Sequence, residues 1–123
     1  MRPFAITLLA ALAAAGSASA AGDAEHGKLV FAQCAACHAM DPADTGASSL
    51  GPPLKGVVGR KAGADETYVY SPPMRRSAAV WTPEALDAFL VDPQVVVPGT
   101  KMPFSGLPTA KDREDLIAYL AAP

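Results

Sequence analysis

The run Cys34-Ala35-Ala36-Cys37-His38 constrains this chain more than any other feature of its sequence. Two cysteines that are separated by two residues and followed at once by a histidine form the attachment signature of a c-type haem. The two thiols can form thioethers with two vinyl groups on one porphyrin edge, and the histidine can bind the iron. The motif therefore predicts one covalent haem c, attached through Cys34 and Cys37, with His38 as an axial ligand.

Three other interpretations of the cysteine pair fit less well. A structural zinc site usually needs four ligands, whereas the chain has two cysteines and one further histidine, His26, which precedes the motif. A thioredoxin-like dithiol would need a βαβ pattern around the motif, and none is visible. A structural disulfide would leave His38 without a role. His26 itself lies in a charged turn and is predicted to be a solvated surface residue.

Residues 1–20 have the pattern of a secretory signal peptide. Arg2 supplies the positive charge, Phe4 to Ala15 form the apolar run, and Ala18-Ser19-Ala20 forms a small-residue cleavage site. The apolar run is shorter than the ~20 residues that a membrane-spanning helix needs. We therefore predict a signal peptide over 1–20, a single domain over 21–123 and a periplasmic location, with no stable membrane insertion after cleavage. An uncleaved membrane anchor is the alternative.

The charge balance narrows the range of partners. Removal of Arg2, one of ten basic residues, leaves nine basic residues against twelve acidic ones. The propionates of a haem would make the protein more acidic still. This balance argues against nucleic acid or an anionic membrane as a partner.

The remaining pattern predicts an all-α fold with three main helices and long loops wrapped around one haem. Asp23 can cap the first helix, Thr82-Pro83 starts the second, and Thr109 starts the last. Gly27 interrupts the first helix and predicts a close approach by the last one. Residues 39–80 show no sustained periodicity. A loop of that length fits a small domain only if a cofactor supplies the core.

The chain resembles the class I cytochromes c, the small soluble monohaem kind of the periplasm and mitochondria. The resemblance covers nearly all of the sequence after residue 21. Besides the haem motif it rests on Gly22-Asp23, Gly51-Pro52-Pro53-Leu54, Gly59-Arg60-Lys61-Ala62-Gly63, Trp81, Pro98-Gly99-Thr100-Lys101-Met102 and Leu116-Ile117-Ala118-Tyr119-Leu120. It implies a soluble one-electron carrier that is not an enzyme.

The resemblance also assigns roles to residues around the haem. The carbonyl of Pro52 is expected to accept a hydrogen bond from His38 Nδ1–H, which fixes the imidazole tautomer. Three further positions that match the family lie near the haem propionates and can donate hydrogen bonds to them, namely Arg60, Tyr70 and Trp81. Tyr68 could exchange places with Tyr70.

The same resemblance implies that Met102 is the sixth ligand of the iron. Met74 is a rival for this role, whereas Met40 is too close to His38 to reach the other face of the haem. Many relatives have a tyrosine at the position of Phe89, so the fine tuning of the site is expected to differ here.

Other functions and the partners are less constrained by the sequence. A haem enzyme or gas sensor would need an open iron position and a distal acid–base group. A haem domain dedicated to one enzyme would use the same residues as a general carrier. The expected partners are membrane or periplasmic redox proteins of the quinol–cytochrome c reductase, oxidase or dehydrogenase type. They would dock transiently on a monomer, helped by Lys28, Lys55 and Lys101.

Overall fold

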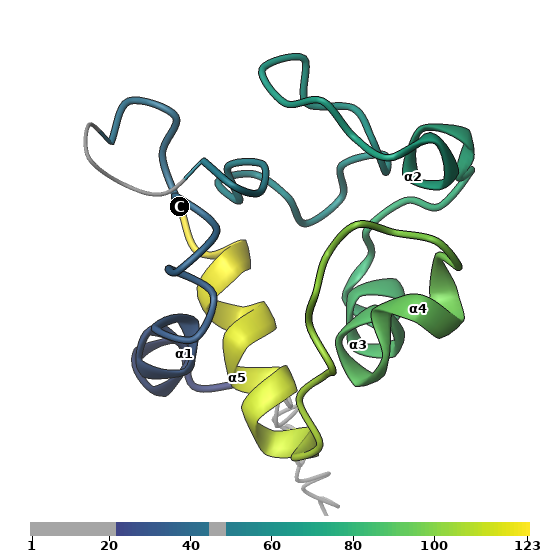
Figure 1. Ribbon diagram of the computed structural model, residues 1–123. Coiled ribbons are helices and arrows are strands. Elements are labelled where there is room, and N and C mark those ends of the chain that lie inside the picture. The colour runs from purple at the N-terminus through teal and green to yellow at the C-terminus, as the bar shows by residue number, and fades with distance from the viewer. Residues whose placement is uncertain (1–21, 45–48) are drawn as a thin grey trace, which may run out of the picture.

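The computed structural model describes residues 22–44 and 49–123, so the predicted signal peptide lies outside the described residues. These residues form the helices α1 (Ala24–Phe31), α2 (Pro72–Arg76), α3 (Pro83–Val91), α4 (Pro93–Val96) and α5 (Ala110–Ala121), which are labelled in Figure 1. In this part of the chain the only β pairing is an isolated antiparallel bridge between Lys61 and Val80. The predicted all-α fold with three main helices, α1, α3 and α5, is confirmed. None of the helices in the described ranges is long and apolar enough to cross a membrane.

The three long helices begin where the capping signals predict. The Asp23 carboxylate accepts hydrogen bonds from two backbone amides in the first turn of α1, which would otherwise have no partner. Thr82 Oγ1 caps α3 in the same way at 3.1 Å, and Pro83 occupies the first helical position. Thr109 precedes α5 but makes no side-chain capping bond.

The two short helices were not predicted from the sequence. Ser71 caps α2 and is followed by Pro72, and Asp92 caps α4 and is followed by Pro93. Both starts therefore use the same cap–proline signal that identified α3. Asp92 also ends α3, as expected of a residue that precedes proline.

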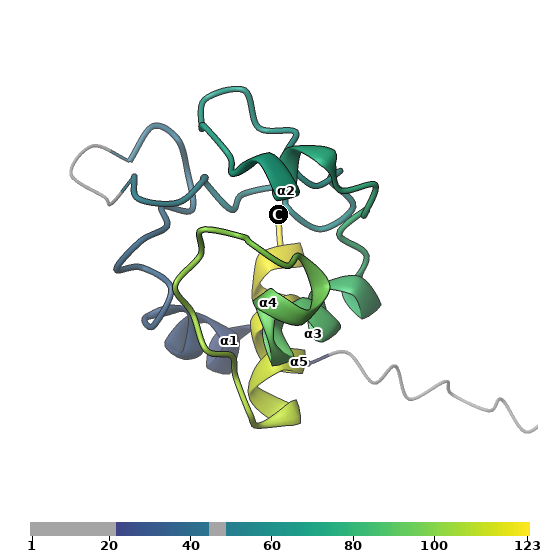
Figure 2. The same cartoon turned by 45° about the vertical axis from the view of Figure 1, so that its right-hand side comes forward.

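Helices α1 and α5 lie side by side in both views (Figures 1 and 2). A Cβ atom at Gly27 would lie 1.9 Å from the carbonyl oxygen of Asp115 and 2.8 Å from Tyr119 Cβ. Only glycine fits there, which confirms the predicted close approach. The rings of Phe31 and Tyr119 extend the contact, with centroids 5.4 Å apart.

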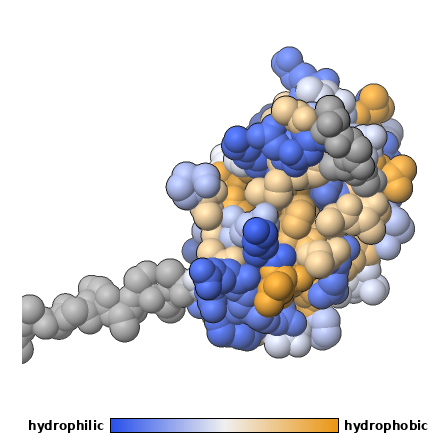
Figure 3. Space-filling view, turned by 90° about the vertical axis from the view of Figure 1, so that its left-hand side faces the viewer, coloured by the Kyte–Doolittle hydropathy of each residue, from blue (hydrophilic) through white to orange (hydrophobic). Residues whose placement is uncertain are grey.

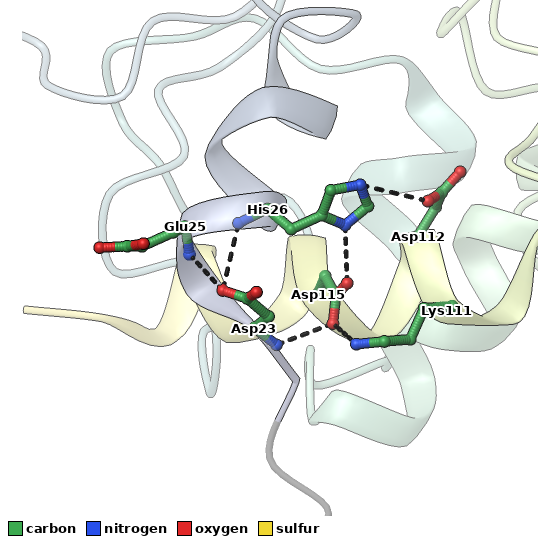
Figure 4. A network of polar contacts seen from close by, with 6 residues as sticks. All are labelled: Asp23, Glu25, His26, Lys111, Asp112 and Asp115. Atoms are coloured by element: carbon green, nitrogen blue, oxygen red, sulfur yellow. Dashed lines mark hydrogen bonds and ion pairs between the residues drawn. The ribbon is translucent and has the colours of Figure 1, made fainter.

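A buried carboxylate joins the two helices through a polar network (Figure 4). Asp115 is 1% exposed and accepts hydrogen bonds from Asp23 N at 2.7 Å, His26 Nδ1 at 2.7 Å and Lys111 Nζ. The bond from Lys111 is the main cause that lowers the pKa of Asp115 to about 2. The His26 side chain is 44% exposed, as expected for a surface histidine, but the prediction missed its contacts with Asp115 and with Asp112, which lies 3.9 Å from the ring.

The network lies at a hydrophilic end of the molecule. In Figure 3, which shows the left-hand side of Figure 1, hydrophilic residues gather around the start of the described chain. Paler and orange apolar residues cover the middle of the same face. None of the network residues, Asp23, His26, Lys111, Asp112 and Asp115, lines the cavity described next.

Candidate haem-binding site

Apolar side chains from α3, α5 and the loops enclose a cavity of about 340 Å³. Its volume lies in the range of small-molecule sites in proteins. The lining includes all of the residues that the sequence predicted for the site: Cys34, Cys37, His38, Pro52, Arg60, Tyr70, Trp81 and Met102. Residues from distant parts of the sequence therefore meet at one place.

The cysteines reach the cavity because the chain continues in helical turns after α1. Cys34 N donates to Phe31 O at 2.8 Å, and His38 N donates to Cys34 O at 2.9 Å. Both cysteines are half-buried free thiols and form no disulfide with each other. Burial, and next the nearby Cys37, raise the pKa of the Cys34 thiol.

The imidazole of His38 is buried and held in one orientation. Its Nδ1 lies 2.7 Å from the carbonyl oxygen of Pro52. Because a carbonyl can only accept, Nδ1 carries the proton and the lone pair of Nε2 remains available to a metal. Burial is the main cause that lowers the pKa of His38, which favours this neutral form. A Cβ at Gly51 would lie 2.4 Å from His38 Cε1, so the backbone itself packs against the ring.

The backbone brings Arg60 and Trp81 together at the cavity. Gly59 N donates to Trp81 O at 2.7 Å, and Trp81 N donates to Arg60 O at 2.8 Å. The Trp81 ring is buried against Phe89, with centroids 4.8 Å apart. Two of the predicted hydrogen-bond donors are therefore neighbours, although they are far apart in sequence.

The geometry separates the roles of the two tyrosines. Tyr68 and Tyr70 form an edge-to-face pair with centroids 5.0 Å apart. The Tyr68 hydroxyl donates to Leu50 O at 3.0 Å, so its proton is already used. The Tyr70 hydroxyl accepts from Asp65 N at 3.3 Å, which leaves its proton available to another acceptor. The arrangement favours Tyr70 as the donor to a ligand in the cavity.

Gln94, which the sequence analysis missed, shapes the loop that carries Met102. Its Nε2 donates to Thr100 O at 2.7 Å, and its Oε1 accepts from Gly99 N at 3.1 Å. Thr100 is buried, and its hydroxyl accepts from Met102 N at 3.4 Å. An amide side chain just after the start of a proline-led helix was the only local signal for this role.

Two thioethers line the cavity. Met102 is half-buried and Met74 is buried, whereas Met40 is not among the lining residues. Phe89 also lines the cavity, so no tyrosine hydroxyl is present at that position.

These residues fit a haem. The cavity combines apolar walls with two thiols, an imidazole with a free Nε2 and thioether sulfur, and it has Arg60 and Tyr70 as donors for carboxylates. Within the described ranges no group of three or more His, Cys, Asp or Glu side chains could hold a metal ion. The interpretation as a four-ligand zinc site therefore gains no support from the structure.

A helical chain that encloses such a cavity beside a haem-attachment motif defines a c-type cytochrome. Residues 24–122 match the sequence model of the family described as Cytochrome c. The chain belongs to the cytochrome c family. It is an electron-transfer protein, not an enzyme, and it binds one covalent haem c, for which Cys34 and Cys37 supply the fitting motif.

Known relatives support this assignment along most of the chain. Cytochrome c2 of Rhodomicrobium vannielii is 46% identical over 112 residues, which cover 91% of this chain and 88% of that protein. Cytochrome c of Tetrahymena pyriformis is 51% identical over 100 residues, covering 80% of this chain and 87% of that protein. The solved structure of cytochrome cH from Methylobacterium extorquens is similar with a TM-score of 0.74 and 43% identity. That match covers 80% of this chain and 97% of the other.

Proposed function

We propose that the protein is a soluble periplasmic one-electron carrier whose haem iron is bound by His38 and Met102. The haem supplies an iron centre that cycles between the ferric and ferrous states. The observation that carries the proposal is the meeting of a neutral imidazole, held through Nδ1, with a thioether in the cavity that the two thiols also line. Soft thioether sulfur favours the ferrous state, so this ligand pair raises the reduction potential.

The chain's own residues hold this site rigid during electron transfer. Pro52 fixes the tautomer of His38, and Gln94 holds the Met102 loop by two hydrogen bonds. With His38 and Met102 as its ligands, the iron would have no free position for a substrate. Arg60, Tyr70 and Trp81 would hold the haem carboxylates by donating hydrogen bonds.

Paired methionine variants test the ligand assignment. Met102→Ala should keep the haem attached but lose the far-red absorption band that reports iron–sulfur coordination. Carbon monoxide or cyanide should then bind readily, and peroxidase activity should rise. Met74→Ala and Met40→Ala should keep the band, which makes them matched controls. Persistence of the band in Met102→Ala together with its loss in Met74→Ala would assign the ligand to Met74 instead.

The periplasmic location rests on the sequence pattern of residues 1–20. Mass spectrometry of protein from a periplasmic extract should show a chain that begins near Ala21 and carries one haem. An intact N-terminus in the membrane fraction would identify an anchor instead.

Transient docking to redox proteins of the quinol–cytochrome c reductase, oxidase or dehydrogenase type completes the proposal. Lys101 lines the cavity and stands over the Tyr68 ring at 4.6 Å, whereas Lys55 is paired with Asp41 at 3.0 Å. Lys101→Gln should slow bimolecular electron transfer at low salt, and the penalty should shrink as salt rises. Lys61→Gln removes the same charge from a residue outside the cavity lining and should matter less. An equal or faster rate for Lys101→Gln would mean that the partner does not recognise this charge.

A further inference from the structure

A carboxylate stands behind two of the cavity's polar side chains without lining the cavity itself. Arg60 and Tyr70 both line the cavity, whereas Asp65 is absent from its described lining. Asp65 Oδ2 lies 3.8 Å from Arg60 Nη1, and the two side chains are only 14% and 19% exposed. The backbone amide of the same residue donates to the Tyr70 hydroxyl at 3.3 Å.

These contacts determine how both side chains face the cavity. Arg60 is held from two sides, because its Nη2 also donates to Pro53 O at 3.0 Å. Tyr70 has one lone pair occupied by the Asp65 amide, which leaves the hydroxyl proton available to an acceptor in the cavity. Asp65 thus contacts two of the three predicted carboxylate donors, Arg60 through its side chain and Tyr70 through its backbone.

The loop around Asp65 keeps its carboxylate in place and charged. Asp65 Oδ1 accepts from the backbone amide of Thr67 at 2.8 Å and from the Thr67 hydroxyl. The hydroxyl bond is the main cause that holds the pKa of Asp65 below its ordinary value. A partly buried negative charge therefore stands beside Arg60 at neutral pH.

We propose that Asp65 is a positioning residue that lowers the reduction potential of this cytochrome by pairing with Arg60 behind the cavity, an inference that rests on the proposed function. Uptake of one electron from the donor protein adds one negative charge inside the cavity. Arg60 stabilises that charge, and the Asp65 carboxylate weakens this stabilisation because it partly neutralises the guanidinium and draws it away from the cavity. Asp65 thereby favours the oxidised protein.

The test compares midpoint potentials of holoproteins by spectroelectrochemistry at 0.1 M salt. Asp65→Asn keeps the backbone amide and an oxygen for Thr67 but removes the charge. Glu66→Gln is the matched control, because it removes the same charge from the exposed neighbouring residue. Asp65→Asn should raise the midpoint potential by about twice the control's shift or more, since solvent and salt screen an exposed charge. Asp65→Glu should return the potential toward that of the unmodified protein.

Two further measurements keep the inference separate from the proposed function. The covalent haem and the far-red sulfur band, recorded on the same samples, report the proposed function and do not depend on Asp65. In an Arg60→Gln background the shift caused by Asp65→Asn should shrink, because the cation that Asp65 holds is gone. Equal shifts for Asp65→Asn and Glu66→Gln, with haem and band intact, would overturn the inference. If the Asp65→Asn holoprotein does not accumulate, the midpoint potential of Asp65→Ala is compared with that of Glu66→Gln in the same way.

Discussion

The α1–α5 crossing and the cavity wall, which we define as residues 49–80 and 97–109, are built in different ways. At the crossing, backbone meets backbone at Gly27, and the buried Asp115 carboxylate finds all its partners within the chain. In the wall, several hydrogen bonds join near neighbours such as Asp65 and Thr67, and apolar side chains turn toward the cavity. The crossing is completed by protein atoms, whereas the core beside the wall is completed by the cofactor.

Preventing haem attachment should have the largest effect, and it should destabilise the cavity wall more than the α1–α5 crossing. A Cys34→Ser/Cys37→Ser double variant cannot form thioethers, so the apolar surface of the wall would lose the partner that buries it. We expect loss of most helical circular dichroism, with any remaining amide protection against hydrogen exchange confined to α1 and α5. The holoprotein is the control. Equal protection of wall and crossing in the haem-free chain would show that the wall is stable on its own.

Gly27→Ala tests the close packing of the crossing. Helix propensity alone predicts a gain of about 1 kcal/mol for this change. The added Cβ would meet the backbone of Asp115, so we expect a loss of about 1–3 kcal/mol in the free energy of unfolding, as overpacked cores show. Lys28→Ala on the exposed side of α1 should change the free energy by no more than about 0.5 kcal/mol. A stabilised Gly27→Ala variant would contradict the packing, and denaturant titration of both holoproteins decides the sign.

Asp115→Asn should give a smaller effect that depends on pH. The folded-state pKa of Asp115 is about 2, below the value of about 3.9 for an unfolded aspartate. The carboxylate therefore contributes stability above about pH 4, and this contribution is lost as the pH falls toward 2. Denaturant unfolding from pH 2 to 7 should show a flatter acid limb for Asp115→Asn than for the unmodified holoprotein.

The neighbouring Asp112 supplies the control for that pH profile. It lies 3.9 Å from His26, and its side chain is 34% exposed. Asp112→Asn should leave the acid limb nearly unchanged. If Asp112→Asn flattens the acid limb as much as Asp115→Asn does, the burial of Asp115 does not make it more important than Asp112 for the stability of the crossing.

Sequence analysis predicted the parts of this molecule that depend on local chemistry. The cap at Asp23, the cap–proline start at Thr82-Pro83 and the haem motif each depend on residues a few positions apart. Helices α2 and α4 carried the same cap–proline signal, but helices of five and four residues are too short to show a periodicity that would support it.

The contacts that were missed depend on the course of the chain in space, whether their partners are distant or near in sequence. His26 looked like a surface histidine because its neighbours are polar, and nothing near it in sequence points to Asp115, which lies 89 positions away. Gln94 was missed because its partners are backbone groups of a loop whose course the sequence does not reveal. The site residues outside the haem motif were predicted only because a family resemblance carried information about the fold.

The separation of 89 positions between His26 and Asp115 has a consequence for the entropy of the whole chain. Bringing the ends of so long a segment together costs about 4 kcal/mol if the cost rises as three-halves of RT times the logarithm of its length. Once α1 and α5 are in contact, the chain between them is a closed loop. Each shorter loop within it then forms in a chain whose two ends are already held together. The motif that attaches the haem lies just after α1, close to the contact that closes this loop. Stabilising the α1–α5 crossing therefore also reduces the number of conformations that are available to the loops around the haem.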